Sequence, residues 1–148
     1  MRCIGLDLGS RTLGISMSDT TGTIATSFKV IRHNEEYEKL IEELKPIIEE
    51  YKVELIVLGL PKNMNGTLGP KGELSYKFKE MLEDKFHLEV ILQDERLTTV
   101  EATNVLIQGD MSRMKRKKVV DSLAATIILQ SYLDKKKKEE RIWMRKRN

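Results

Sequence analysis

Three apolar segments close to the amino terminus constrain the fold most strongly. Residues 2–9, 13–18 and 23–31 alternate apolar and small or polar side chains, which is the pattern of short strands. The joints between them, residues 9–12 and 19–22, are brief and rich in glycine and polar residues. Strands connected by such short turns must be antiparallel neighbours. The chain is therefore predicted to begin as a three-stranded antiparallel sheet.

The apolar period then changes to that of helices alternating with single strands. Residues 37–51 have helical spacing, with Asn34 as the predicted N-cap and Pro46 predicted to bend or tighten the helix. The continuously apolar residues 54–60 predict a central buried strand. The remaining pattern predicts, in order, a loop over 61–70, a helix around 74–82, a strand over 88–92, a helix over 98–107 and a last helix entered through the basic residues 113–118.

This order of elements predicts an α/β fold. Right-handed crossovers place the fourth and fifth strands parallel to the first, so the sheet is mixed and five-stranded, with helices on both faces. A chain of 148 residues fits one domain of this kind. We assign residues 1–134 to the domain and residues 135–148 to a basic C-terminal tail, which is predicted to fray.

Charge is distributed unevenly along the chain. Residues 1–109 carry 13 Lys and Arg against 18 Asp and Glu, whereas residues 110–148 carry 13 against 5. This asymmetry favours a polyanionic partner such as nucleic acid, although a solvated tail is the alternative. No run approaches the ~18–20 apolar residues of a membrane span. The single Cys3 excludes an internal disulfide, and Asp7 stands where a secretory signal would be apolar, so we expect a cytoplasmic protein.

Acidic residues fall at the predicted carboxyl ends of strands, where open α/β sheets place their chemistry. Asp7 lies near the end of the otherwise apolar first strand, and burying an acid there is costly unless it is paired or binds a metal. Asp94 and Glu95 follow the fifth strand, and Asp121 falls in the first turns of the last helix. Each has a structural alternative: Asp7 could cap a turn, Glu95 could pair with Arg96, and Asp121 could complement the helix dipole.

Carboxylates gathered in one cleft repel one another and so need cations. Oxygen ligands suit Mg²⁺ or Mn²⁺, and the chain has no cluster of soft ligands. Two such ions, about 3.5–4 Å apart, can activate water and stabilise the leaving oxygen of a phosphodiester. His33 and His87 have no partner in the pattern and are interpreted as surface residues.

Four motifs in order carry a family resemblance. They are residues 4–15 (IGLDLGSRTLGI), 59–70 (GLPKNMNGTLGP), 94–102 (DERLTTVEA) and 121–130 (DSLAATIILQ). Together they resemble the YqgF (RuvX) family over about residues 2–133. The resemblance implies a ribonuclease H-like fold and a nuclease acting in maturation of the 5′ end of pre-16S ribosomal RNA. An older description of the family is Holliday-junction resolvase.

By the same resemblance, Asp7, Glu95 and Asp121 are the catalytic acids that bind metal, and Asp94 either shares the metal or holds the strand end. One departure stands out. Related junction resolvases place their second acid at the end of the fourth strand, where this chain has residues 59–61 (GLP). In this chain the acid follows the fifth strand instead. It is therefore open whether this chain would cut a junction with the same geometry as those resolvases.

Basic and amide side chains next to these motifs are the candidates for holding a nucleic acid. Arg96 could equally form a salt bridge to Asp94 or Glu95, and the basic run before Asp121 could be a solvated loop. The candidate nucleic-acid-binding residues are Arg11, Lys62, Asn63, Asn65, Arg96, Arg113, Lys115, Arg116, Lys117 and Lys118.

Four functions remain open from the sequence. The first is a metal-dependent endonuclease on structured RNA, with or without a ribosomal particle as partner. The second is the same chemistry on branched DNA, for which a homodimer rather than a monomer is expected because a four-way junction is cut at two symmetric points. The third is a non-catalytic RNA-binding factor. The fourth, a sugar-kinase or actin-type ATPase suggested by residues 7–12, conflicts with the length, because those enzymes close two such lobes around ATP.

Overall fold

The computed structural model describes residues 1–61, 66–94 and 113–147, and it describes side chains for these residues except 113–122 and 147. Five strands and three helices are described. In chain order they are β1 (Cys3–Leu8), β2 (Thr12–Ser18), β3 (Ala25–Arg32), α1 (Tyr37–Glu50), β4 (Leu55–Leu60), α2 (Pro70–Phe86), β5 (Glu89–Asp94) and α4 (Arg113–Arg147).

The strands form one mixed sheet in the order β3-β2-β1-β4-β5. β2 is antiparallel to both β1 and β3, while β4 is parallel to β1 and to β5. The predicted mixed five-stranded α/β sheet is therefore confirmed, including its antiparallel beginning. Because β1 lies in the middle, its apolar residues Ile4 and Leu6 are fully buried.

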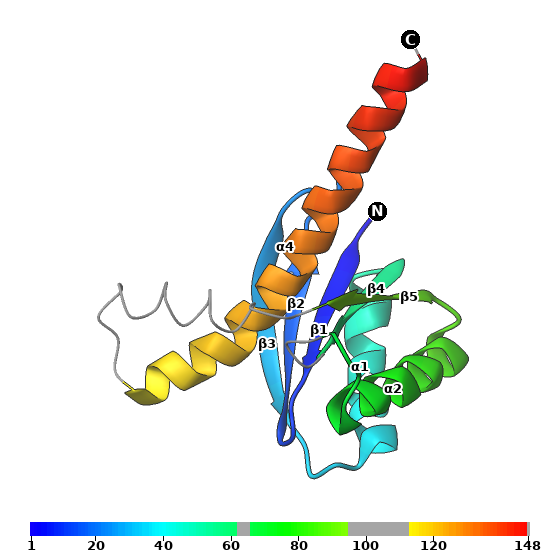
Figure 1. The fold of residues 1–148 in the computed structure, drawn as a ribbon. Helices are drawn as coiled ribbons and strands as arrows, with labels where there is room; N and C mark the ends of the chain where they lie inside the picture. Colours follow the sequence, from blue (N-terminus) through cyan, green and yellow to red (C-terminus); the bar gives the residue numbers. More distant parts are fainter. Residues whose placement is uncertain (62–65, 95–112, 148) are drawn as a thin grey trace.

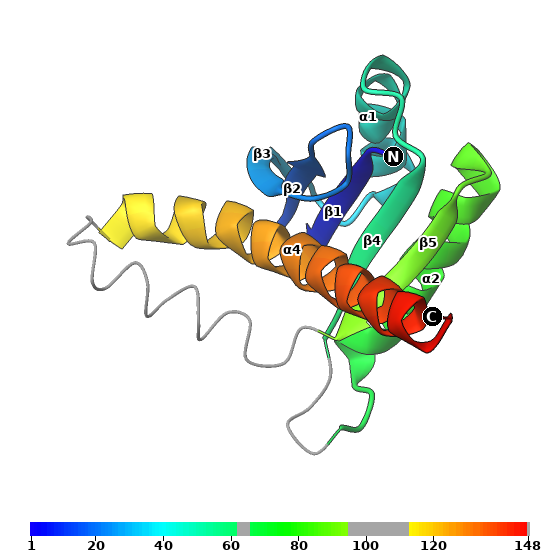
Figure 2. The ribbon, with the colours of Figure 1, turned by 90° about the horizontal axis from the view of Figure 1, so that it is seen from above.

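Helices cover both faces of the sheet, as predicted (Figures 1 and 2). α1 and α2 lie on one face, and α4 crosses the other. Side chains alternate between the faces along each strand. On β1, Ile4 and Leu6 join the apolar cluster beneath α1 and α2, whereas Cys3 joins the smaller cluster beneath α4.

Small residues allow α4 to approach the sheet closely. Gly5 of β1 has no side chain, and a Cβ built there would lie 2.7 Å from Leu129 Cβ and 3.0 Å from Ala125 O. Beside it, the Ser16 hydroxyl donates a hydrogen bond of 2.7 Å to Ala125 O. The two contacts fix where the helix crosses the sheet, because a larger side chain at either position would push it away.

Two local expectations, the N-cap of α1 and the end of the loop before α2, are corrected. α1 begins after Glu36 rather than after Asn34, without a side-chain cap hydrogen bond, and it continues through Pro46. Pro70, predicted as loop, begins α2, where its missing N–H has no cost. The predicted helix over 98–107 lies outside the described residues.

The expectation of a frayed tail is wrong, because α4 continues to Arg147. Residues 135–147 contain neither glycine nor proline and are rich in Lys, Arg and Glu, which are good helix formers. Extending an existing helix also avoids the cost of nucleation. In the part of the chain that the structure describes, no helix combines the length and apolar character needed to cross a membrane.

Candidate active site

The parallel strands β1, β4 and β5 bring their carboxyl ends to one edge of the sheet. Asp7 is the last but one residue of β1, and Asp94 is the last residue of β5, paired with Leu60 at the end of β4. Both residues are half-buried. Glu95 follows directly in the sequence and lies outside the described residues.

Alternation along the strands separates Asp7 from Asp94. Asp7 is four residues after Cys3 and so faces the same side of the sheet, the side on which Cys3 packs beneath α4. Asp94 is two and four residues after Leu92 and Val90 and so faces their side of the sheet, where both pack with the cluster beneath α1 and α2. The two acids therefore belong to opposite faces of the sheet, and this favours the strand-end role over metal binding for Asp94.

The neighbours of Asp7 in the sheet are both glycines. Its partner on β2 is Gly14. On β4, Gly59 is one residue beyond the Leu6–Leu58 pair, at the level of Asp7. Neither neighbour has a side chain that could lie between Asp7 and α4. A half-buried carboxylate supplies hard oxygen ligands, which suit a divalent cation such as Mg²⁺ or Mn²⁺.

Asp121 belongs to the early part of α4. Leu133 of α4 packs in one cluster with Cys3, and Leu129 lies over Gly5, so the helix runs back from Leu133 towards the level of Asp7. Asp121 precedes Ala125 by about one helical turn. Its side chain is not among those described, so its role as a ligand stays a prediction.

No group of three potential His, Cys, Asp or Glu ligands is found among the residues whose side chains are described. Of the three predicted catalytic acids, only Asp7 belongs to that part. The structure therefore describes one acid of the predicted set, near the carboxyl end of β1, and its catalytic role stays a prediction.

His33 has a role that the sequence pattern did not reveal. Its backbone N–H donates to Arg11 O at 2.9 Å, and its Nδ1 accepts from the Glu35 N–H at 3.0 Å. Since Nδ1 accepts, Nε2 carries the hydrogen in this arrangement and donates to Gly9 O at 2.9 Å. His33 thus holds the turn that follows Asp7, and the interpretation as a residue without partners is wrong.

The register of the β2–β3 hairpin could have revealed this contact. Thr12 pairs with Arg32, so the next residue outward on each strand brings Arg11 opposite His33. Arg11 itself is exposed at the tip of the turn, at the same edge as Asp7. Its contact to nucleic acid stays a prediction.

The other predicted nucleic-acid contacts are placed incompletely. Lys62, Asn63, Asn65 and Arg96 lie outside the described residues. The basic run is helical rather than a loop, because it forms the first turns of α4, and its side chains are not described. That run comprises Arg113, Lys115, Arg116, Lys117 and Lys118.

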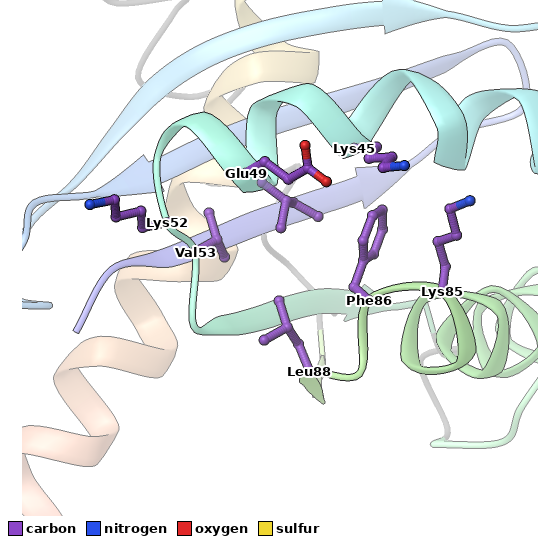
Figure 3. A pocket seen from close by; sticks show the side chains of 8 residues that line it. Lys45, Glu49, Lys52, Val53, Lys85, Phe86 and Leu88 are labelled. Atoms are coloured by element: carbon purple, nitrogen blue, oxygen red, sulfur yellow. The ribbon is translucent and has the colours of Figure 1, made fainter.

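A pocket of about 390 Å³ lies at the opposite edge of the sheet (Figure 3). Val53 and Leu88, which precede β4 and β5, line it together with the end of α1 and with Phe86. These residues mark the amino ends of the parallel strands. The pocket is therefore separate from the edge that carries Asp7.

Comparison with solved structures defines the class of fold. Thermus thermophilus RuvC in complex with a Holliday junction substrate superposes with a TM-score of 0.57 at 11% identity, covering 86% of this chain and 91% of that one. A second structure of the same protein gives a TM-score of 0.53. The mixed sheet with helices on both faces is thus a ribonuclease H-like fold.

Sequence comparison then identifies the family. Residues 1–135 match the model of the RuvX family, described as Holliday junction resolvase. A protein of Thermoanaerobacter pseudethanolicus named "Putative pre-16S rRNA nuclease" is 53% identical over 138 residues, 93% of this chain and 99% of that protein. One of the same name from Geobacillus sp. (strain WCH70) is 53% identical over 137 residues, 92% and 99% of the two chains. The chain belongs to the RuvX family.

Proposed function

We propose that this protein is a metal-dependent nuclease that hydrolyses phosphodiester bonds of pre-16S ribosomal RNA during maturation of its 5′ end. The position of Asp7 carries the proposal: a carboxylate at the end of the central strand of a ribonuclease H-like sheet, between two glycine neighbours. The names of the relatives supply the substrate. Such a role places the protein in the cytoplasm, and a ribosomal particle is the natural form of the substrate.

Asp7, Glu95 and Asp121 are the residues proposed to hold the metal. Bound Mg²⁺ or Mn²⁺ would supply activation of water and stabilisation of the leaving oxygen. Because Asp7 lies within a central strand, its backbone is already ordered before a metal ion binds to the carboxylate. Arg11, on the turn that His33 holds, is proposed to bind a phosphate through its guanidinium.

The first experiment offers the purified protein an RNA fragment spanning the 5′ end of pre-16S ribosomal RNA, with Mg²⁺ or Mn²⁺. Asp7→Asn keeps the size of the side chain and removes its charge. We expect cleavage to fall by a factor of about 10³ or more, because a ligand of the reactive ions is lost. The exposed Asp84 on α2 provides the matched control, and Asp84→Asn should cleave normally.

Full activity of Asp7→Asn would overturn the proposed nuclease. Assembled precursor particles should be included as a substrate, because the reaction can require a ribosomal partner. If no substrate is cut while Asp7→Asn still supports ribosome maturation in cells, the protein acts as a non-catalytic RNA-binding factor.

Branched DNA is the second candidate substrate. The description of the family and the fold of RuvC favour it. The acid that related resolvases place at the end of β4 is missing here, since that strand ends in Gly59 and Leu60. Synthetic four-way junctions tested beside the RNA decide between the two. Symmetric junction cleavage by a homodimer, with intact RNA, would replace the proposal.

A further inference from the structure

The end of α4 projects beyond the body of the protein (Figure 1). We refer to residues 135–147 as the C-terminal extension. The match to the family model ends at residue 135, whereas α4 continues to Arg147. Among the described side chains of α4, that of Leu133 is the last one that is buried. The extension therefore adds no buried side chain to the body of the protein.

The C-terminal extension is strongly basic. It contains eight Lys and Arg residues against two Glu residues. Its described side chains are exposed except for the half-buried Lys136. The ion pairs among the described residues, Lys79–Glu83 and Lys85–Glu42, lie on α1 and α2, so these pairs neutralise no charge of the extension.

Basic residues lie on all sides of the C-terminal extension, and one side carries basic residues but neither of its two glutamates. Residues three, four and seven positions apart share one helix face. Lys138, Arg141 and Arg145 therefore lie on a single side, which carries no acidic residue within the extension; Asp134, four positions before Lys138, precedes them on the same side. Glu139 and Glu140 lie on other sides of the helix, four positions after Lys135 and Lys136, and Glu140 lines a small pocket with Met1 and Thr23 of the body. We refer to Lys138, Arg141 and Arg145 as the basic stripe.

The apolar residues of the extension are arranged differently. Ile142, Trp143 and Met144 are exposed by 44%, 58% and 57%, and they are consecutive. Consecutive helical residues point in directions about 100° apart, so they form no apolar face. An amphipathic helix that lies on a membrane needs such a face. The pattern favours a partner recognised by charge.

We propose that the basic stripe binds the phosphate backbone of the RNA on which the protein acts, away from the cleavage edge. The stripe extends about 10 Å along the helix, the axial length of about three phosphates of one strand in a double helix. Two of its three residues are arginines, which bind phosphate oxygens bidentately. The inference rests on the proposed function, because it takes RNA as the substrate.

Equilibrium binding tests the inference without cleavage. The full chain carrying Asp7→Asn is titrated against a labelled RNA fragment spanning the 5′ end of pre-16S ribosomal RNA, from about 50 to 300 mM KCl. Adding Lys138→Gln, Arg141→Gln and Arg145→Gln should weaken binding and reduce the slope of log affinity against log salt by about 2–3. Glutamine retains helix propensity, and circular dichroism verifies the helix.

A matched control removes three charges elsewhere. Lys39, Lys45 and Lys77 are exposed on α1 and α2, on the other side of the sheet. Changing them to Gln should leave the slope unchanged. An equal loss in both triple variants would show a general charge effect and overturn the inference, as would no loss in either. Arg141→Lys with Arg145→Lys keeps the charge and should retain most of the slope.

Anionic vesicles separate RNA from a membrane partner. Trp143 is the single tryptophan of the chain, so its fluorescence reports directly on the extension. A blue shift with phosphatidylserine vesicles, combined with RNA binding that is insensitive to the stripe, would overturn the inference. If RNA binding does not depend on the basic stripe but cleavage still depends on Asp7, the inference fails and the proposed nuclease stands, because cleavage and binding are measured separately.

Discussion

Gly5 shows how one residue determines the packing of a whole helix. It lies in the central strand, where glycine is unfavourable for the strand itself. The compensation is the close approach of α4, with Ala125 and Leu129 directly over it and the Ser16 hydroxyl hydrogen-bonded to the helix backbone. A strand residue that looks weak in isolation is therefore required by the layer above it.

Replacing Gly5 with alanine should destabilise the protein. The added Cβ would lie 2.3 Å from Ser16 Oγ and 2.7 Å from Leu129 Cβ, so helix and sheet must separate. We expect a loss of about 1–3 kcal/mol in the free energy of unfolding, measured by urea denaturation. Unchanged stability of Gly5→Ala would contradict the close packing.

At the scale of elements, the turn between β2 and β3 is held by one carboxylate. Asp19 accepts hydrogen bonds from the N–H groups of Thr23 and Ile24, at 2.8 and 3.0 Å, and from the Thr21 hydroxyl. These bonds, that of the Thr21 hydroxyl most of all, hold the pKa of Asp19 well below its usual range. The charged form therefore stabilises the turn that orients β3.

The pH dependence of stability follows from this depressed pKa. Because the folded pKa is below the unfolded value of about 3.9, the contribution of Asp19 is complete above that pH and declines as the pH falls towards the folded value. Asp19→Asn should thus be less stable than the unsubstituted protein at neutral pH, and the difference should narrow below about pH 4. Urea denaturation over a pH series measures it. Asp84→Asn serves as the control, and a constant difference at all pH values would contradict the role of the charge.

At the scale of the whole molecule, α4 belongs to two regions. Up to Leu133 its buried side chains close one face of the sheet, and its end projects from the body. The helix backbone is continuous between the two. The end of α4 therefore does not mark the end of the domain. We propose that residues 1–134 are sufficient for the stability of the fold.

Truncation tests that proposal. A chain ending at Asp134 retains every buried residue of α4 and should unfold at nearly the same urea concentration as the full chain. A chain ending at Gln130 loses Tyr132 and Leu133 from the cluster around Cys3 and should lose about 2 kcal/mol or more. Equal destabilisation by both truncations would show that the extension belongs to the folded domain.

Much of the fold could be predicted because its signals are local. The short joints required antiparallel strands, and the apolar residues of β4 indicated a central strand. The helical state of residues 135–147 was missed, because a basic run suggests solvation and says little about an upstream helix that it extends. His33 was missed for a related reason: its bonds to Gly9 and Glu35 depend on hairpin register, which no single segment encodes.

The candidate site divides in the same way. The sequence alone determined that an acid ends the central strand, since strand pattern and charge are both local properties of the chain. Only the tertiary structure decided which face of the sheet each acid occupies. Asp7 belongs to the face of α4 and Asp94 to that of α1 and α2. Alternation along a strand tells which residues share a face, but only the packing of the helices tells which helix covers that face.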